Sequence, residues 1–511
     1  MSASIDEAEL DARVREVLCN WPVVGLAAGV IRNGSLGWFY GHGVADVTSG
    51  TPIDQDTVFR IASVTKTMTA IATMQLRDQR QVDLDAPTSD YLRAYRLIPA
   101  RAGFRPATLR HLLTHTAGVR AVRKPSDLIR PALGWGVPAG QPIPTLAEHY
   151  RDGLHVDTQP GTKWAYSNSG FATLGQIAED VSGLPLGRYL REHVFGPLGM
   201  NSSDLVRSGR VRPHLATGYE IRSRGATAVR DLEMVHAGGG AVYSTTGDMA
   251  RYVAALLGGG ANSCGAALRP QTLAEMFEPQ YQPDPRIPGM GLGFFRGQAG
   301  GYRTAGHDGI WLGFHAAVVL VPDEGIGVVA LTNTGPFGPF AATGPVADAV
   351  LRSLLGLPGD VPATDVPERP WDWDELCGSY SFGPGILTDP QPRMLGPAVQ
   401  VVARRDHLAV RGQLPVPAIR RGLRLYPDAG DPDVFRVILP GFGSGTSLVV
   451  FSRDPAGEVT GMHLGMQPMS FRKRPRSPCQ APGSLTRRGM PGAACRSTPP
   501  ARSSPSRRSG G

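Results

Sequence analysis

The stretch that most constrains this chain runs from Val58 to Ile71, where a serine is followed three positions later by a lysine. Apolar residues precede the serine, and the pattern predicts an extended segment that turns into a helix at Ser63 and continues to about Gln79. Residues i and i+3 share a helix face, so the Ser63 hydroxyl and the Lys66 amine are expected side by side. The first turn also offers free N–H groups and partial positive charge. This segment can therefore hold a nucleophile, a base and donors for a developing oxyanion.

The Ser-x-x-Lys spacing alone is a weak signal, because a helix-capping serine beside a solvated lysine explains it equally well. The composition of the chain adds weight to the chemical interpretation. Of the 52 lysines and arginines only four are lysines, at positions 66, 124, 163 and 473. An amine loses its proton when its surroundings help, whereas a guanidinium does not. A lysine retained at this spacing, in a chain that otherwise uses arginine, favours a chemical role.

The net charge of +8 does not describe the body of the chain. Ten basic residues and no acidic residue lie between Arg472 and the end, and removing them leaves a net charge of about −2. The composition, with 41% hydrophobic and 19% charged residues, is typical of a globular enzyme of two or more domains. The basic pI belongs to the tail and gives no reason to expect a nucleic-acid partner.

The sequence also gives no sign of export or of a membrane anchor. The first eleven residues are polar and acidic, without the basic and apolar regions of a secretory signal, and no apolar run approaches the length of a membrane span. The five cysteines are scattered and form neither a zinc motif nor a disulfide framework. These observations predict a cytoplasmic protein without membrane contact.

The pattern of apolar runs predicts an α/β (α+β) fold, in which helices flank an antiparallel sheet that carries an all-α insertion. Runs at 23–31 and 36–44 flank Arg32-Asn33-Gly34, which is a strong hairpin signal. Residues 83–236 read as mainly helical with long loops. Strands return after 291, with a second hairpin at 314–321 and 326–332, and a helix is expected at about 346–355.

The expected organisation has four parts. Residues 1–356 form the first domain, and the Pro- and Gly-rich stretch 357–371 reads as a linker. Residues 372–473 contain short apolar runs that predict a small antiparallel β domain, of which a barrel is one form. Pro, Ser, Gly and Arg dominate residues 474–511, which are predicted to form a disordered basic tail.

Two further motifs carry reactive or hydrogen-bonding side chains. Tyr166-Ser167-Asn168 follows a Pro-Gly-Thr turn, and His307-Asp308-Gly309 precedes a buried strand. Taken alone, Tyr166 is a core aromatic with a bonded hydroxyl, and His307 is a histidine at the start of a strand. The pair His111 and His115 lacks a third ligand at metal spacing and is interpreted as structural hydrogen bonding at a helix end.

In this order and at these intervals the three motifs resemble the serine β-lactamase and penicillin-binding-protein superfamily. The nearest branch is the class C β-lactamase group with family VIII carboxylesterases, D-aminopeptidases and D,D-peptidases. The resemblance covers about residues 20–355. It is supported by Leu112-Leu-Thr-His-Thr-Ala-Gly, Pro160-Gly-Thr-Lys-Trp-Ala-Tyr-Ser-Asn, Phe195-Gly-Pro-Leu-Gly-Met and the Gly-rich stretch at 238.

The resemblance implies a division of roles at the site. Ser63 would be the nucleophile that forms an acyl-enzyme, and Lys66 would assist removal of its proton. Tyr166, as a phenolate near Lys66, would serve as general base and later as acid for the leaving group. Asn168 would bind Lys66 or the substrate. No metal or organic cofactor is implied.

On the substrate side, the resemblance places His307, Gly309 and Ile310. The backbone N–H groups of Ser63 and Ile310 would form the oxyanion hole, and Gly309 would allow close approach of the substrate. His307 stands where β-lactamases and D,D-peptidases commonly have a lysine that anchors a substrate carboxylate. A histidine is mostly neutral at pH 7, so this departure favours esters, amides or D-amino-acid derivatives over β-lactams.

The sequence therefore predicts a serine hydrolase acting on small ester, amide or peptide substrates, of esterase or D-aminopeptidase type. The alternatives are β-lactamase or D,D-peptidase activity, an acyltransferase that passes the same acyl group to an alcohol or amine, and a non-catalytic relative that binds ligands. The substrate's identity and chirality and the oligomeric state do not follow from the sequence.

Overall fold

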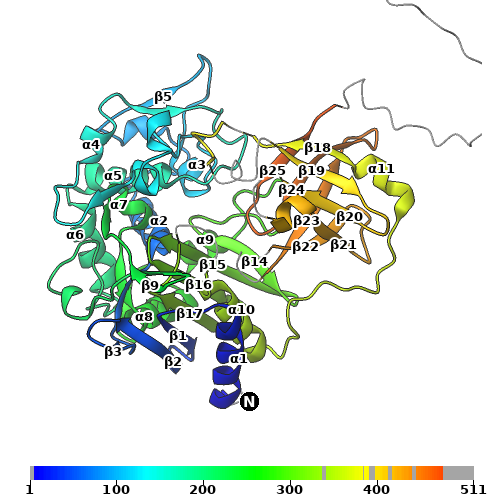
Figure 1. The fold of residues 1–511 in the computed structure, drawn as a ribbon. Helices are drawn as coiled ribbons and strands as arrows, with labels where there is room; N and C mark the ends of the chain where they lie inside the picture. The colour runs from blue at the N-terminus through cyan, green and yellow to red at the C-terminus, as the bar shows by residue number, and fades with distance from the viewer. Residues whose placement is uncertain are drawn as a thin grey trace, which may run out of the picture. The chain divides into compact units, whose positions relative to one another are not determined.

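The computed structural model describes residues 5–336, 341–383, 385–390, 398–412, 417–439 and 445–475 (Figure 1). All of the helices and strands named below belong to the compact unit that ends at Arg474. Residues 476–511, which make up nearly all of the tail predicted to be disordered, lie outside the described residues.

A seven-stranded antiparallel sheet organises the first part of the chain, in the order β14-β15-β16-β17-β1-β2-β3. Its centre joins the two ends of this part, because β1 pairs with β17 and places Leu26 opposite Thr332. The predicted hairpin is present, and Asn33 and Gly34 take positive φ angles of 53° and 76° in its turn. The strands are β1 (Gly25–Arg32), β2 (Ser35–Asp46), β3 (Thr51–Pro52), β14 (Phe295–Ala299), β15 (Tyr302–Trp311), β16 (Phe314–Val321) and β17 (Ile326–Thr332).

Helices cover both faces of this sheet. Because side chains alternate along a strand, Leu26 and Val30 join one core with α1 (Glu7–Asn20) and α10 (Thr343–Leu354). Ala27 and Ile31 join the other core, which contains α2 (Thr65–Asp78), α8 (Thr246–Leu257) and α9 (Pro270–Phe277). The α2 helix, which follows Ser63 and contains Lys66, is thus buried on nearly every side.

The predicted insertion at 83–236 contains helices and also short strands in pairs. Its longest helix is α5, which Ser167 caps at the N-terminus and Gly183, with φ 73°, ends. The abundant glycines and prolines keep the other helices short, and extended segments pair to satisfy backbone groups. The elements are α3 (Leu109–Leu113), α4 (Leu146–His149), α5 (Asn168–Ser182), α6 (Leu186–Leu190), β5 (Leu97–Pro99), β6 (Gly136–Pro138), β7 (Leu154–Val156), β8 (Tyr219–Arg222), β9 (Gly225–Ala228) and β10 (Leu232–Met234).

Four short elements connect this region to α8 and α9. They are α7 (Ala237–Gly240), β11 (Tyr243–Thr245), β12 (Ala261–Asn262) and β13 (Gly265–Ala266). Thr245 caps α8, because its hydroxyl accepts a hydrogen bond from the Asp248 N–H at 3.0 Å. Among the described residues, no helix combines the length and the apolar character needed to cross a membrane.

The C-terminal strands close into an eight-stranded antiparallel barrel. Its first strand, β18, pairs with its last, β25, so this sheet exposes no edge to other chains. The barrel has an apolar core of its own, which includes Tyr380, Leu408 and Phe451. Its strands are β18 (Gly378–Ser381), β19 (Ala398–Ala403), β20 (Leu408–Arg411), β21 (Leu423–Pro427), β22 (Val434–Ile438), β23 (Thr446–Arg453), β24 (Val459–Leu464) and β25 (Ser470–Lys473), with helices α11 (Trp373–Leu376) and α13 (Pro417–Arg421).

Polar contacts hold the barrel against the rest of this unit. Arg286 pairs with Asp431 at 3.1 Å and donates to the Phe451 carbonyl at 2.8 Å. The Thr388 hydroxyl donates to the Asp157 carboxylate at 2.6 Å, next to the loop that leads into α5. The barrel therefore reaches the neighbourhood of the Tyr166 segment.

Candidate active site

Ser63 lies in a 3-10 turn, Ala62–Val64, between β4 (Val58–Arg60) and α2. The α-helix begins at Thr65, two residues later than the sequence predicted. In a 3-10 turn residues i and i+3 eclipse one another, so this geometry brings Ser63 and Lys66 together. The Lys66 Nζ atom lies 2.9 Å from Ser63 Oγ. The predicted serine–lysine contact is present.

Lys66 is fully buried and its amine has three polar neighbours. Besides Ser63 Oγ, the Nζ atom donates to Asn168 Oδ1 at 2.6 Å and to the Gly239 carbonyl at 2.5 Å. Burial penalises the ammonium form and lowers the pKa of Lys66 well below its ordinary value. A lysine in this position is available as a base at a pH where a solvated lysine is not.

The three neighbours of Lys66 are not equivalent. Carbonyl oxygens only accept hydrogen bonds, so Asn168 Oδ1 and the Gly239 carbonyl each take an N–H from Nζ. The remaining tetrahedral position faces the Ser63 hydroxyl. In the neutral amine that position is a lone pair, which accepts the Ser63 proton. The geometry therefore suits transfer of a proton from Ser63 to Lys66.

The segment with Tyr166 and Asn168 leads into α5 and is held by His115. The Ser167 N–H donates to His115 Nδ1 at 3.1 Å, and the Ser167 hydroxyl accepts from the Gly170 N–H to cap the helix. Asn168 is the first residue of α5, so its amide faces Lys66 from a fixed position. The interpretation of His115 as a structural hydrogen-bonding residue is consistent with these contacts.

Tyr166 is buried beside the amine, with Lys66 Nζ 4.8 Å from its ring centroid. Its hydroxyl shares a hydrogen bond with the Ser63 side chain. Burial raises the pKa of Tyr166 well above its ordinary value, and the hydrogen bond to Ser63 offsets only part of that rise. This raised pKa does not support the expected phenolate. It favours a neutral Tyr166 hydroxyl, which can donate a proton.

The strand β15 carries the third motif, His307-Asp308-Gly309, and passes beside the Ser63 turn. β14 pairs with β15 only as far as Gly306, so on that side the strand is without a partner from His307 onward among the described residues. The 3-10 turn of Ser63 lies there instead. A Cβ atom on Gly309 would stand 2.1 Å from the Ile61 carbonyl oxygen, so only glycine permits this approach. Ile310 follows on the same strand and pairs with His315 of β16.

His307 is buried against aromatic rings. Its ring centroid lies 4.9 Å from that of Phe295 and 6.2 Å from that of Tyr166. Burial lowers the pKa of His307 to about 3. The imidazole is therefore neutral at physiological pH, and the expectation that it is a poor anchor for a carboxylate is consistent with this environment.

All seven residues singled out in the sequence lie at or beside this cluster. Sequence reasoning missed the Gly239 carbonyl, which binds Lys66 from a position 173 residues further along the chain. The sequence feature that could have identified this contact is the run of glycines in α7. A Cβ atom on Gly239 would stand 3.1 Å from the Asn168 carbonyl oxygen, so α7 approaches α5 closely only because its residues are small. Phe295, which packs on His307 and stacks with Tyr166, carried no recognisable signal.

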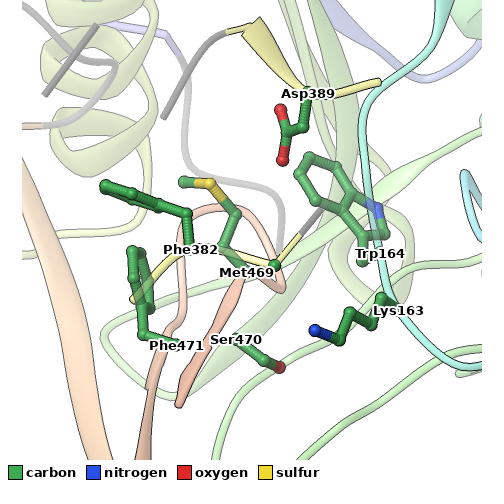
Figure 2. A pocket seen from close by; sticks show the side chains of 8 residues that line it. Lys163, Trp164, Phe382, Asp389, Met469, Ser470 and Phe471 are labelled. Carbon is green, nitrogen blue, oxygen red and sulfur yellow. The ribbon is translucent and has the colours of Figure 1, made fainter. Parts of the chain in front are cut away.

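A small hollow lies on the barrel side of the Tyr166 segment (Figure 2). Lys163 and Trp164 form one wall of this hollow, and the other wall comes from barrel residues, among them Phe382, Met469 and Phe471. The Trp164 ring lies 6.2 Å from the Tyr166 ring, so this wall continues into the site. The barrel thus supports the loop that carries Tyr166.

Comparison with curated proteins finds relatives of known activity. Esterase EstB of Burkholderia gladioli is 28% identical over 369 residues, which cover 65% of this chain and 92% of the esterase. The D-alanyl-D-alanine-carboxypeptidase/endopeptidase AmpH of Escherichia coli K12 is 29% identical over 353 residues, covering 66% of this chain and 86% of AmpH.

Solved structures with the same fold extend the comparison. The octameric penicillin-binding protein homologue from Pyrococcus abyssi matches with a TM-score of 0.57 at 21% identity, covering 92% of this chain and all of that one. The D-amino acid amidase from Ochrobactrum anthropi SV3 matches with a TM-score of 0.56 at 22% identity, covering 68% of this chain and 99% of the amidase. At these identities the likeness establishes the fold.

The family comparison covers most of the region described above. The model described as Beta-lactamase matches residues 10–352, about two thirds of the chain, and this span contains Ser63, Lys66, Tyr166 and His307. The described residues contain no group of three or more His, Cys, Asp or Glu side chains arranged to hold a metal ion. By its sequence and its fold, the chain belongs to the beta-lactamase family of serine hydrolases.

Proposed function

We propose that this protein hydrolyses small esters or amides through an acyl-enzyme on Ser63. The observation that carries the proposal is the position of the Lys66 amine. It is fully buried, two carbonyl oxygens fix two of its N–H groups, and its third position meets Ser63 Oγ at 2.9 Å. A serine hydroxyl becomes a useful nucleophile when a base of lowered pKa lies within hydrogen-bond reach.

The steps follow from this arrangement. The neutral Lys66 amine accepts the Ser63 proton while Oγ attacks the substrate carbonyl carbon. The N–H groups of Ser63 and Ile310 stabilise the resulting oxyanion. The neutral Tyr166 hydroxyl donates its proton to the leaving oxygen or nitrogen and recovers one from the Lys66 ammonium. A water molecule then attacks the acyl-enzyme by the reverse sequence and regenerates Ser63.

The proposed substrates lack a carboxylate near the scissile bond. His307 is neutral and so supplies no cation at the position where a carboxylate-binding lysine would be needed. This favours ester and amide hydrolysis, of the esterase or D-aminopeptidase type, over cleavage of β-lactams or of peptides with a free C-terminus. The relationship to esterase EstB supports the same choice. Transfer of the acyl group to an added alcohol or amine is the second candidate, because it uses the same acyl-enzyme.

The test is intact-protein mass spectrometry after brief exposure to a fluorophosphonate and, separately, to p-nitrophenyl butyrate. We expect one covalent adduct on the native protein and none on Ser63→Ala. Ser223→Ala, a change at an exposed serine between β8 and β9, is the matched control and should label like the native protein. An adduct on Ser63→Ala, or no adduct on the native protein with either reagent, would overturn the proposal.

We also propose a cytoplasmic location and a domain division at residues 357–371. Cys19 and Cys264 are exposed free thiols, which supports a reducing compartment. Residues 357–369 form no helix or strand, which supports a boundary between a catalytic domain ending at residue 356 and a β domain at 372–473. Limited proteolysis that releases an intact barrel fragment would support the division, and first cuts inside β19 or β23 would contradict it.

A further inference from the structure

The Lys66 amine receives one of its two fixed acceptors from a helix with little stability of its own. The helix α7 has four residues, and three of them are glycines. Helices this short are marginal without tertiary contacts, and glycine weakens them further. Its N-cap residue, His236, does not cap it with a side-chain hydrogen bond. The place of the Gly239 carbonyl must therefore be set by contacts between α7 and its neighbours.

Contacts with α2 and α5 hold the carbonyl end of α7. The Thr69 hydroxyl donates to the Gly238 carbonyl at 2.8 Å, and the Lys66 amine donates to the Gly239 carbonyl. Glycine lets the two helices meet, because a Cβ atom on Gly238 would stand 2.8 Å from the Phe171 carbonyl oxygen of α5. One of these contacts is the bond to Lys66 itself. An anchor that is independent of Lys66 is needed at the other end of α7.

His236 supplies an anchor at that end. Its side chain is buried, and its Nε2 atom lies 2.8 Å from the Tyr150 hydroxyl oxygen. The two rings are stacked, with 14° between their planes. Tyr150 is buried in the apolar core that contains α2 and α5, so its ring has little freedom to move. Burial raises the pKa of Tyr150 and lowers that of His236, so both side chains are neutral at physiological pH.

Stability alone does not explain this polar pair. His236 Nδ1 is buried and has no hydrogen-bond partner in the part of the chain that the structure describes. An unpartnered buried nitrogen costs free energy, and an apolar pair of similar shape would avoid that cost. What the pair adds is a directional bond at the start of α7. The Gly239 N–H donates to the His236 carbonyl at 2.8 Å, so the anchored residue and the Lys66 acceptor belong to one hydrogen-bonded turn.

We propose that Tyr150 and His236 are positioning residues for the base, because their hydrogen bond holds α7 where the Gly239 carbonyl meets the Lys66 amine. This proposal rests on the proposed acyl-Ser63 chemistry and adds two residues that act on it through α7. Without the bond, α7 gains freedom and one Lys66 N–H loses its fixed acceptor. The lone pair of the amine then no longer stays aimed at Ser63 Oγ, and Ser63 is activated less often, whatever the substrate.

The test replaces the polar pair by an apolar one of similar size, in the double variant Tyr150→Phe/His236→Leu. Its melting temperature should equal or exceed that of the native protein, because the unpartnered nitrogen leaves together with the hydroxyl. We expect kcat to fall about tenfold on both p-nitrophenyl butyrate and ethyl butyrate, with KM changed less than about twofold. The rate at which a fluorophosphonate labels Ser63 should fall by the same factor. A role in packing alone would make activity follow stability.

Two single variants serve as controls. His236→Gln keeps an amide that can donate to the Tyr150 hydroxyl or accept from it, so it should recover most of the activity that His236→Leu loses. Tyr95→Phe removes a hydroxyl from the neighbouring ring, whose centroid lies 5.0 Å from that of Tyr150. That hydroxyl bonds Thr173 of α5 and not α7, so Tyr95→Phe should behave like the native protein.

A double-mutant cycle tests whether the effect passes through the amine. In a Lys66→Met protein the double substitution should cause no further loss in the labelling rate of Ser63, because the group that it positions is already absent. Two results would overturn the proposal. One is a folded double variant with kcat and labelling rate within twofold of native, and the other is an undiminished loss when Lys66 has already been replaced.

Failure of this role is distinguishable from failure of the proposed function. If the native protein is labelled at Ser63 and hydrolyses p-nitrophenyl butyrate, the acyl-enzyme chemistry stands whatever the double variant shows. If the native protein is neither labelled nor active on either ester, the proposed function fails first, and the positioning role fails with it.

Discussion

The two sides of the site differ in how their polar atoms are satisfied. On the α2 side, the Lys66 amine has a partner for each of its hydrogen-bonding positions, and α5 and α7 hold two of those partners in place. On the β15 side, His307 Nε2 has none among the described residues. One side is complete before a substrate arrives, and the other becomes complete only with one.

This difference suggests that the α2 side carries out the reaction and that the β15 side selects the substrate. A fully bonded, buried network has one arrangement and serves any substrate that reaches Ser63, because preorganised groups need no rearrangement during reaction. Acceptors left open contribute only when a substrate supplies the matching donor, and a wrong substrate leaves them desolvated and unpaired. Changes on the α2 side should lower all activities together, whereas changes on the β15 side should alter the ranking of substrates.

The largest effect should come from Lys66→Met, which keeps the apolar stem and removes the amine. Without a base on Ser63 we expect kcat/KM to fall by about 10³-fold or more for every ester tested. Circular dichroism should show a folded protein, and Lys124→Met, at an exposed lysine, should retain native kinetics. A loss below tenfold would mean that another group takes the Ser63 proton.

Tyr166→Phe should have a smaller effect that depends on the leaving group. As a proton donor, the Tyr166 hydroxyl matters most when the leaving group is a poor one, so ethyl butyrate should lose about 10²-fold and p-nitrophenyl butyrate much less. Tyr95→Phe removes another buried hydroxyl, which bonds Thr173, and should leave the kinetics unchanged. Equal losses on the two esters would instead assign Tyr166 to proton removal from Ser63.

Gly309→Ala tests whether β15 must stay close to the Ser63 turn for catalysis. The added Cβ atom would stand 2.1 Å from a backbone oxygen, which no side-chain motion relieves, so β15 must move away from the Ser63 turn. We expect a loss of about 1–3 kcal/mol in unfolding free energy and about 10–100-fold in kcat. Gly209→Ala, where a Cβ meets no atom within 4 Å, is the control for denaturation and kinetics. A native kcat in Gly309→Ala would show that catalysis does not need this close approach of β15 to the Ser63 turn.

The sequence predicted the elements whose signals are local and missed the contacts that depend on distant packing. The Asn33-Gly34 hairpin and the Ser63–Lys66 contact follow from turn chemistry and helical spacing, and the structure has both. The Gly239 carbonyl became a Lys66 partner only because α7 packs against α5. The raised pKa of Tyr166 likewise depends on burial by residues from several elements, whereas proximity to Lys66 alone suggested a lowered pKa.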